Sequence, residues 1–165
     1  MVIELDFLDV IKTRRSIRRY KPDPVPDDVL NKILEAARLA PSAGHRQPWH
    51  FIVVKDAETK KKLGISPWAA EAPVVIVGCG DSSASSVWYP VDLAIAFEHI
   101  VLTAANFGLG TCWMGKMGID EPVKQALKIP AHVKVIAVTP LGYPAETPGP
   151  KARKSLSEIV HYEQF

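Results

Sequence analysis

The chain has 165 residues, a length that fits one compact domain. Hydrophobic residues make up 47% of it and charged residues 23%, close to the average of globular proteins and sufficient for a core of modest size. The 20 basic and 18 acidic residues leave a net charge of +2, and the pI is near 8.5. This balance argues against a nucleic-acid partner, which usually requires a strongly basic domain with clustered cations.

The cysteines and the chain ends exclude several other classes. Cys79 and Cys112 lie far apart in apolar stretches, with neither metal-ligand nor C-x-x-C spacing, so we expect two reduced, buried thiols and no metal site. The N-terminus lacks the basic segment and long apolar run of a signal peptide. Charged residues interrupt every apolar stretch well before the ~20 residues that span a bilayer. We therefore expect a cytoplasmic protein without a membrane partner.

The first half of the chain predicts helices around one strand. Residues 7–14 have apolar residues at helical spacing, whereas three alternating prolines make residues 20–26 extended. An aspartate then caps a helix over residues 27–39. The β-branched residues 50–55 predict a strand, and a lysine-rich helical turn follows at residues 58–63.

The second half predicts three more strands and a long apolar helix. The continuous apolar run 73–79 is typical of a strand buried on both faces. Residues 91–107 are apolar almost all round, which predicts a helix in the core or at an interface. Residues 111–114 and 133–139 read as strands, and residues 121–127 as a short helix. The sum is an α+β chain with about four strands and four or five helices.

The last segment, residues 144–165, has no periodicity and begins with a run of prolines. Its end carries Ile159, Val160, Tyr162 and Phe165, which are too apolar to stay in water. We interpret the chain as one domain, 1–165, whose C-terminal arm packs on a partner subunit.

Three segments carry groups suited to ligand binding, and each also has a plain structural reading. The arginine-rich residues 14–19 could bind an anion through guanidinium forks, or form a solvated basic turn. Residues 40–51 combine small residues with one amide, and could line a flat ligand or form only a rigid loop. The glycines of residues 107–115 permit close backbone approach to a ligand, or simply end a helix before a core strand. G-x-G-x-x-G and P-loop patterns are absent.

The order of these segments along the chain favours ligand binding over a purely structural role. An Arg-Arg-Ser-x-Arg cluster is followed by Ala-Pro-Ser-x-x-x-x-Gln-Pro-Trp-x-Phe and by a long apolar helix ending in Gly-Leu-Gly-Thr-x-Trp-x-Gly. A C-terminal Lys-x-Arg-Lys-x-Leu completes the series. In this order, over nearly the whole chain, the sequence resembles the nitroreductase family of flavoproteins.

The resemblance implies an α+β sandwich with a central, mainly antiparallel sheet flanked by helices, in a homodimer that exchanges arms. FMN would lie at the dimer interface, with NAD(P)H as co-substrate. The residues that match the family's flavin contacts are Arg14, Arg15, Ser16, Arg18, Pro41, Ser42, Ala43, Gly44, Gln47, Cys112, Trp113, Met114, Gly115, Lys151 and Arg153.

The resemblance also assigns these residues different parts of the flavin. Arg14, Arg15 and Ser16 would hold the phosphate and ribityl chain, and Lys151 and Arg153 would close the phosphate pocket. Arg18 would lie near the N1/O2 edge of the ring. The loop containing Gln47 would line the site from the other protomer, and residues 110–115 would pass beside N5.

Two departures from the family pattern affect the expected site. His45 stands where family members often carry asparagine. The chain is short between residues 63 and 73, where larger relatives insert helices, so we expect an open pocket with Trp68, Trp88 or Tyr89 as wall residues.

The activity implied is hydride transfer from NAD(P)H and reduction of a nitroaromatic, quinone or similar acceptor in a ping-pong cycle. The flavin carries this chemistry, so no protein residue is assigned as catalytic. Two alternatives remain: a non-catalytic FMN-binding dimer, or a same-fold enzyme for another flavin reaction such as dehalogenation or flavin fragmentation.

Overall fold

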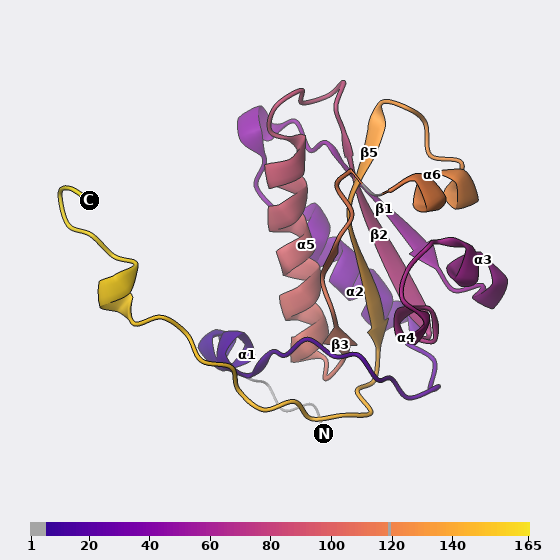
Figure 1. Ribbon diagram of the computed structural model, residues 1–165, viewed down its shortest axis with the longest axis horizontal. Coiled ribbons are helices and arrows are strands. Elements are labelled where there is room, and N and C mark those ends of the chain that lie inside the picture. Colours follow the sequence, from indigo (N-terminus) through magenta and orange to yellow (C-terminus); the bar gives the residue numbers. More distant parts are fainter. Residues whose placement is uncertain (1–5, 119) are drawn as a thin grey trace.

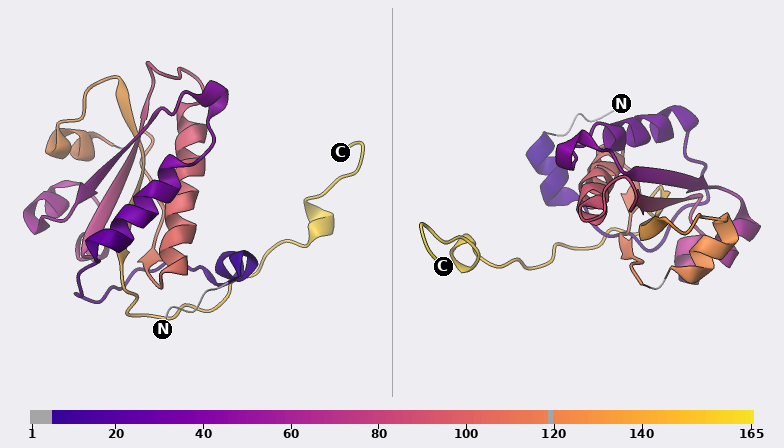
Figure 2. Two further views of the ribbon diagram at one scale, coloured as in Figure 1. Left: turned by 180° about the vertical axis from the view of Figure 1, so that it is seen from behind. Right: turned by 90° about the horizontal axis from the view of Figure 1, so that it is seen from above.

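A computed structural model describes residues 6–118 and 120–165. A sheet lies between two layers of helices, with α2 and α5 on one face and α3, α4 and α6 on the other (Figures 1 and 2). Within the described ranges the strands are Trp49–Val54 (β1), Val74–Asp81 (β2), Gly110–Thr111 (β3), Met114–Gly115 (β4) and Val133–Gly142 (β5). The α-helices are Phe7–Thr13 (α1), Asp27–Arg38 (α2), Ala57–Lys62 (α3), Pro67–Ala70 (α4), Tyr89–Asn106 (α5) and Glu121–Leu127 (α6). Short 3₁₀ turns occupy Ala43–His45 and Leu156–Glu158.

The sheet has the order β1-β2-β5-β3, β4 also pairs with β5, and every pairing is antiparallel. The α+β class and mainly antiparallel sheet predicted from the sequence are confirmed. Strand β2 is buried along nearly its whole length, as its apolar run indicates. Alternate residues face different layers: Val74 and Ile76 pack towards α2 and α5, while Val75 and Val77 pack towards α3 and α6.

Helix α5 is the central helix of the larger layer. Its prediction as an apolar core or interface helix is confirmed, although it begins two residues earlier than expected. Pro90 lies in its first turn, where a missing N–H removes no intrahelical bond. The helix approaches β2 so closely that a Cβ on Gly78 would lie 2.8 Å from the ring of Phe97. A glycine is therefore required at this crossing.

Three elements differ from the sequence expectations. The strand expected over 111–114 is interrupted, because the Cys112 N–H donates to Thr139 Oγ1 (3.0 Å) rather than to a backbone carbonyl. Strand β5 extends beyond its expected end at residue 139, to Gly142. It passes through Pro140, which lies opposite the gap between β3 and β4. Helix α4 was not predicted; Pro67 starts it in the short segment before β2.

The C-terminal segment leaves the body of the molecule. Residues near its start are held down, since Ala145 N–H donates to Arg19 O and Lys21 N–H donates to Tyr143 O (both 2.9 Å). From residue 151 onward every residue is exposed, and the segment extends away from the body (Figures 1 and 2). Leu156 and Tyr162 are among the exposed apolar side chains of this arm. No helix within residues 6–118 or 120–165 has the length and apolar character needed to cross a membrane.

Candidate functional site

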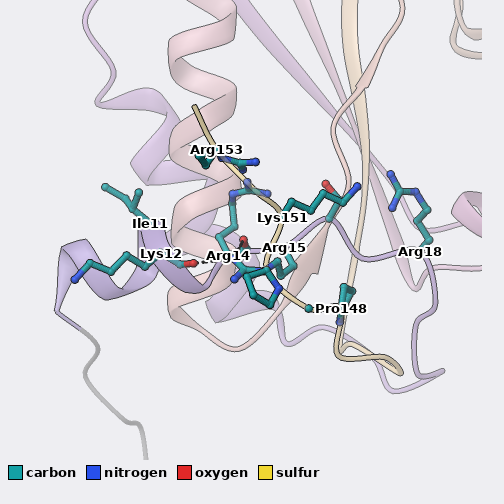
Figure 3. Close-up of a pocket in the computed structure, with 11 residues that line it drawn as sticks. Ile11, Lys12, Arg14, Arg15, Arg18, Pro148, Lys151 and Arg153 are labelled. Carbon is teal, nitrogen blue, oxygen red and sulfur yellow. Dashed lines mark hydrogen bonds between the residues drawn. The ribbon is translucent and has the colours of Figure 1, made fainter. Parts of the chain in front are cut away.

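A cavity of about 420 Å³ opens between the end of α1, the segment after it and the start of the C-terminal arm (Figure 3). Among the described residues, its wall contains several cations and no aspartate or glutamate. The lining residues are Ile11, Lys12, Arg14, Arg15, Ser16, Arg18, Pro148, Gly149, Pro150, Lys151 and Arg153. Two predicted clusters, far apart in sequence, therefore lie at one cavity within a single chain.

Backbone pairing places the arginine-rich segment there. Ser16 forms a β-bridge with Thr111, and Ile17 N–H donates to Thr111 O at 2.8 Å. A Cβ on Gly110 would lie 2.6 Å from Ile17, so this close approach also requires glycine. The segment thus runs between the edge strand β3 and the start of the C-terminal arm.

The cavity concentrates positive charge, and no carboxylate among the described residues lines it. Arg15 donates to the carbonyls of Lys12 (2.7 Å) and Arg14 (2.8 Å), which are neutral acceptors. Lys12 has only an exposed ion pair with Asp9 at 3.4 Å. Burial raises the pKa of Glu98 on α5, and the positive charge of Arg14 opposes this rise. An anion with several oxygens would satisfy these donors.

Arg18 lies apart from the other cations of the cavity (Figure 3). Its guanidinium carbon is 6.0 Å from the centroid of the Trp68 ring, within the range of a cation–π contact. Its backbone N–H donates to Glu146 Oε1 at 2.6 Å, which fixes the start of the side chain. Arg18 and Trp68 therefore form a separate, aromatic part of the cavity region.

The predicted loop 41–47 lies at the opposite end of α5. Its 3₁₀ turn lies beside the N-terminal end of the helix, whereas α1 lies near the C-terminal end (Figure 1). Ala43 N–H donates to Oδ1 of Asp92, in the first turn of α5, at 3.0 Å. Ala105, near the other end of α5, lines a second hollow of about 380 Å³ together with Arg14. At ~1.5 Å per residue, Asp92 and Ala105 are about 20 Å apart along the helix.

The loop has an unusual backbone. Gly44, His45 and Gln47 have positive φ values of 58°, 55° and 47°. Gln47 N–H donates to Ser42 Oγ at 3.0 Å, and the side chains of Gln47 and His45 approach to 3.2 Å. Left-handed conformations are unfavourable for most L-residues and are better tolerated by asparagine, so asparagine would suit the backbone at position 45 better than a β-branched residue.

The third predicted group, Cys112–Gly115, lies along the β3–β4 edge and does not line the cationic cavity. Cys112 is buried, and Trp113 packs edge-to-face on Phe97 with ring centroids 4.8 Å apart. Met114 is half-buried and Gly115 is exposed. This group therefore offers mainly backbone and the Trp113 ring to a ligand.

Sequence reasoning missed part of the cavity wall. Lys12 lies two positions before Arg14 and could have been found from that spacing. Residues 148–150 have no polar side chains that would indicate a binding site. Of the suggested wall residues, Trp68 contacts the cavity region through Arg18. Trp88 and Tyr89 lie at the other end of α5, near the loop.

The left-handed backbone at His45 predicts an asymmetric response to substitution. His45→Val should lower the free energy of unfolding by about 1–2 kcal/mol, because a β-branched residue is strained at positive φ. His45→Asn should leave it unchanged or raise it slightly. Urea unfolding at fixed protein concentration measures both, and equal losses for the two variants would contradict the backbone explanation.

Comparison with known proteins identifies the family and the fold. The model of the nitroreductase family matches residues 11–66 and 60–143. A protein of Methanothermobacter thermautotrophicus, named as a candidate NADH dehydrogenase/NAD(P)H nitroreductase, is 43% identical over 157 residues, covering 90% of this chain and 82% of the relative. An FMN-dependent nitroreductase structure from Clostridium difficile R20291 has 32% identity and a TM-score of 0.85, covering 96% of this chain and 99% of that chain.

The similarity extends to proteins named for a different activity. Iodotyrosine deiodinase 1 of Rattus norvegicus is 29% identical over 196 residues, covering 94% of this chain and 68% of the relative. The family match nonetheless spans the greater part of the sequence, and the fold agrees throughout. This chain belongs to the nitroreductase family of oxidoreductases.

Proposed function

We propose that this chain is an FMN-dependent oxidoreductase that takes hydride from NAD(P)H, and that two copies of the chain build each flavin site. The main support for the proposal is the cationic cavity, which brings Arg14 and Ser16 together with Lys151 and Arg153 and has no carboxylate among its described lining residues. Guanidinium forks, an ammonium group and a hydroxyl are the donors that a phosphate monoester prefers. The cavity, with a volume of about 420 Å³, has room for the phosphate and part of the ribityl chain.

The two-chain arrangement follows from the separation of the predicted contacts. The loop bearing Ser42 and Gln47 is held at the N-terminal end of α5, while the cationic cavity lies near its C-terminal end. A flavin with its phosphate in the cavity would meet the loop of a second copy. The exposed apolar arm, residues 144–165, supports this dimer because its side chains need a surface to cover them.

The protein's part in the reaction is binding and electrostatics. FMN supplies the capacity to accept and donate hydride. Arg18 would place a positive charge at one edge of the ring, with its orientation restrained by Trp68. NAD(P)H and then a nitroaromatic, quinone or similar acceptor would use the same open face in turn. This ping-pong order requires no general acid or base from the chain.

Two alternative functions share the same flavin site. A binding protein would hold FMN that NAD(P)H cannot reduce. An enzyme for another flavin reaction, of which the deiodinase relative is an example, would accept electrons but pass them to a different substrate. We favour the reductase because a candidate NAD(P)H nitroreductase is 43% identical to this chain.

Anaerobic absorbance spectroscopy tests the proposed function directly. The purified protein should carry flavin bands that bleach when NADPH or NADH is added, and a quinone or nitroaromatic should restore them. Bands that persist with both nucleotides would favour the binding-protein alternative. Reduction without reoxidation by either acceptor would favour another flavin reaction, and failure to bind added FMN would contradict the proposal altogether.

The phosphate assignment predicts that Arg14→Ala combined with Arg153→Ala raises the dissociation constant for FMN by at least about a hundredfold, because two charge-assisted contacts are lost. Fluorescence titration of the apoprotein with FMN measures this change. A matched double variant, Lys32→Ala with Arg38→Ala on α2, removes the same charge away from the cavity and should bind FMN normally. If the Arg14/Arg153 variant retains the flavin fully, these two residues do not bind the phosphate.

A further inference from the structure

Asp92 is a carboxylate in an unusual position. It lies in the first turn of α5 and is only 3% exposed. Its Oδ1 accepts the Ala43 N–H at 3.0 Å, while its Oδ2 is buried without a hydrogen-bond partner among the described residues. Burial of a polar oxygen without a donor is unfavourable, so the fold alone gives little reason for an aspartate here.

A hydrogen bond to Asp92 anchors the strained loop, residues 42–47, to helix α5. The other hydrogen bonds of Ser42–Gln47 are local: His45 N–H donates to Ser42 O, and Gln47 N–H donates to Ser42 Oγ. Within the described residues, the Ala43–Asp92 bond is the hydrogen bond that ties this loop to another element. The positive φ angles of the loop persist only if surrounding contacts hold them.

A simple helix-dipole role does not account for this placement. A carboxylate in the first turn of a helix interacts favourably with the dipole, but it does so equally well when exposed to water. Asp92 is instead turned inward, beside the buried Leu93 and within reach of the loop backbone. The inward position of Asp92 therefore serves its hydrogen bond with the Ala43 N–H.

We propose that Asp92 is a positioning residue that holds the Ser42–Gln47 loop in the conformation required to contact the flavin ring bound by the partner subunit. The inference rests on the proposed function. Asp92 itself touches no part of the ligand; it acts through Ala43. The loop supplies contacts to the ring, whereas the cationic cavity at the other end of α5 supplies contacts to the phosphate. Loss of Asp92 should therefore weaken ring binding and leave phosphate binding unchanged.

The test compares Asp92→Ala and Asp92→Asn with the wild-type protein, using FMN, riboflavin and inorganic phosphate as ligands. Asp92→Ala should raise the dissociation constants of FMN and riboflavin by the same factor, about tenfold. Its affinity for inorganic phosphate, measured by calorimetry on the apoprotein, should not change. Asp92→Asn keeps an oxygen that can accept the Ala43 N–H, so it should restore both flavin affinities to within about threefold of the wild type.

Ser85→Ala is the matched control. Ser85 is also buried just before α5, and among the described residues its hydroxyl has no partner and makes no hydrogen bond to the loop. This variant should keep wild-type flavin affinity, and a loss equal to that of Asp92→Ala would overturn the proposal. Unchanged riboflavin affinity in Asp92→Ala would also overturn it, whatever the effect on stability. Failure of the wild-type protein to bind FMN would instead refute the proposed function.

Discussion

The length and rigidity of α5 determine how this chain can build a flavin site. The helix is 18 residues long, and its close packing on β2 through Gly78 and Phe97 fixes it against the sheet. Its N-terminal turn holds the loop 41–47 through Asp92, while the cationic cavity lies near its C-terminal end. About 20 Å of helix lie between them, so we propose that the two groups of predicted contacts belong to two different sites. A second copy of the chain is the natural source of the missing half.

The cationic cavity depends on the backbone rather than on pairs between side chains. The segment after α1 is fixed by the Ser16–Thr111 bridge, and the arm is fixed where Ala145 bonds to Arg19. These pairings bring together cations that repel one another, with no carboxylate among the described residues that line the cavity. Such an arrangement is stabilised when a dianion binds, so FMN binding and local stability should be coupled. The arm from residue 151 onward is also exposed, as are the apolar side chains Phe7 and Leu8 of α1.

Much of this architecture was predictable from periodicity and motifs, because helices, buried strands and the arginine cluster leave local signals. The apolar run of β2 and the near-continuous apolar pattern of α5 identified both elements within about two residues. The break at Cys112 was not predictable, since it depends on the Thr139 hydroxyl of another strand. Neither were the left-handed angles at His45 or the burial of Asp92, which arise only when the loop packs against α5. Tertiary contacts, not local propensity, set these features.

The claim that each site draws on two chains is tested most directly by complementation in mixed dimers. One chain carries Arg14→Ala with Arg153→Ala, and the other carries Ser42→Trp, which fills the ring side of the site. Neither variant should bind FMN tightly by itself. A mixed dimer combines both defects in one site and leaves the other site intact. We therefore expect one tightly bound FMN per mixed dimer, measured by flavin absorbance. Mixed dimers that bind no FMN, although both variants are folded, would contradict the shared site.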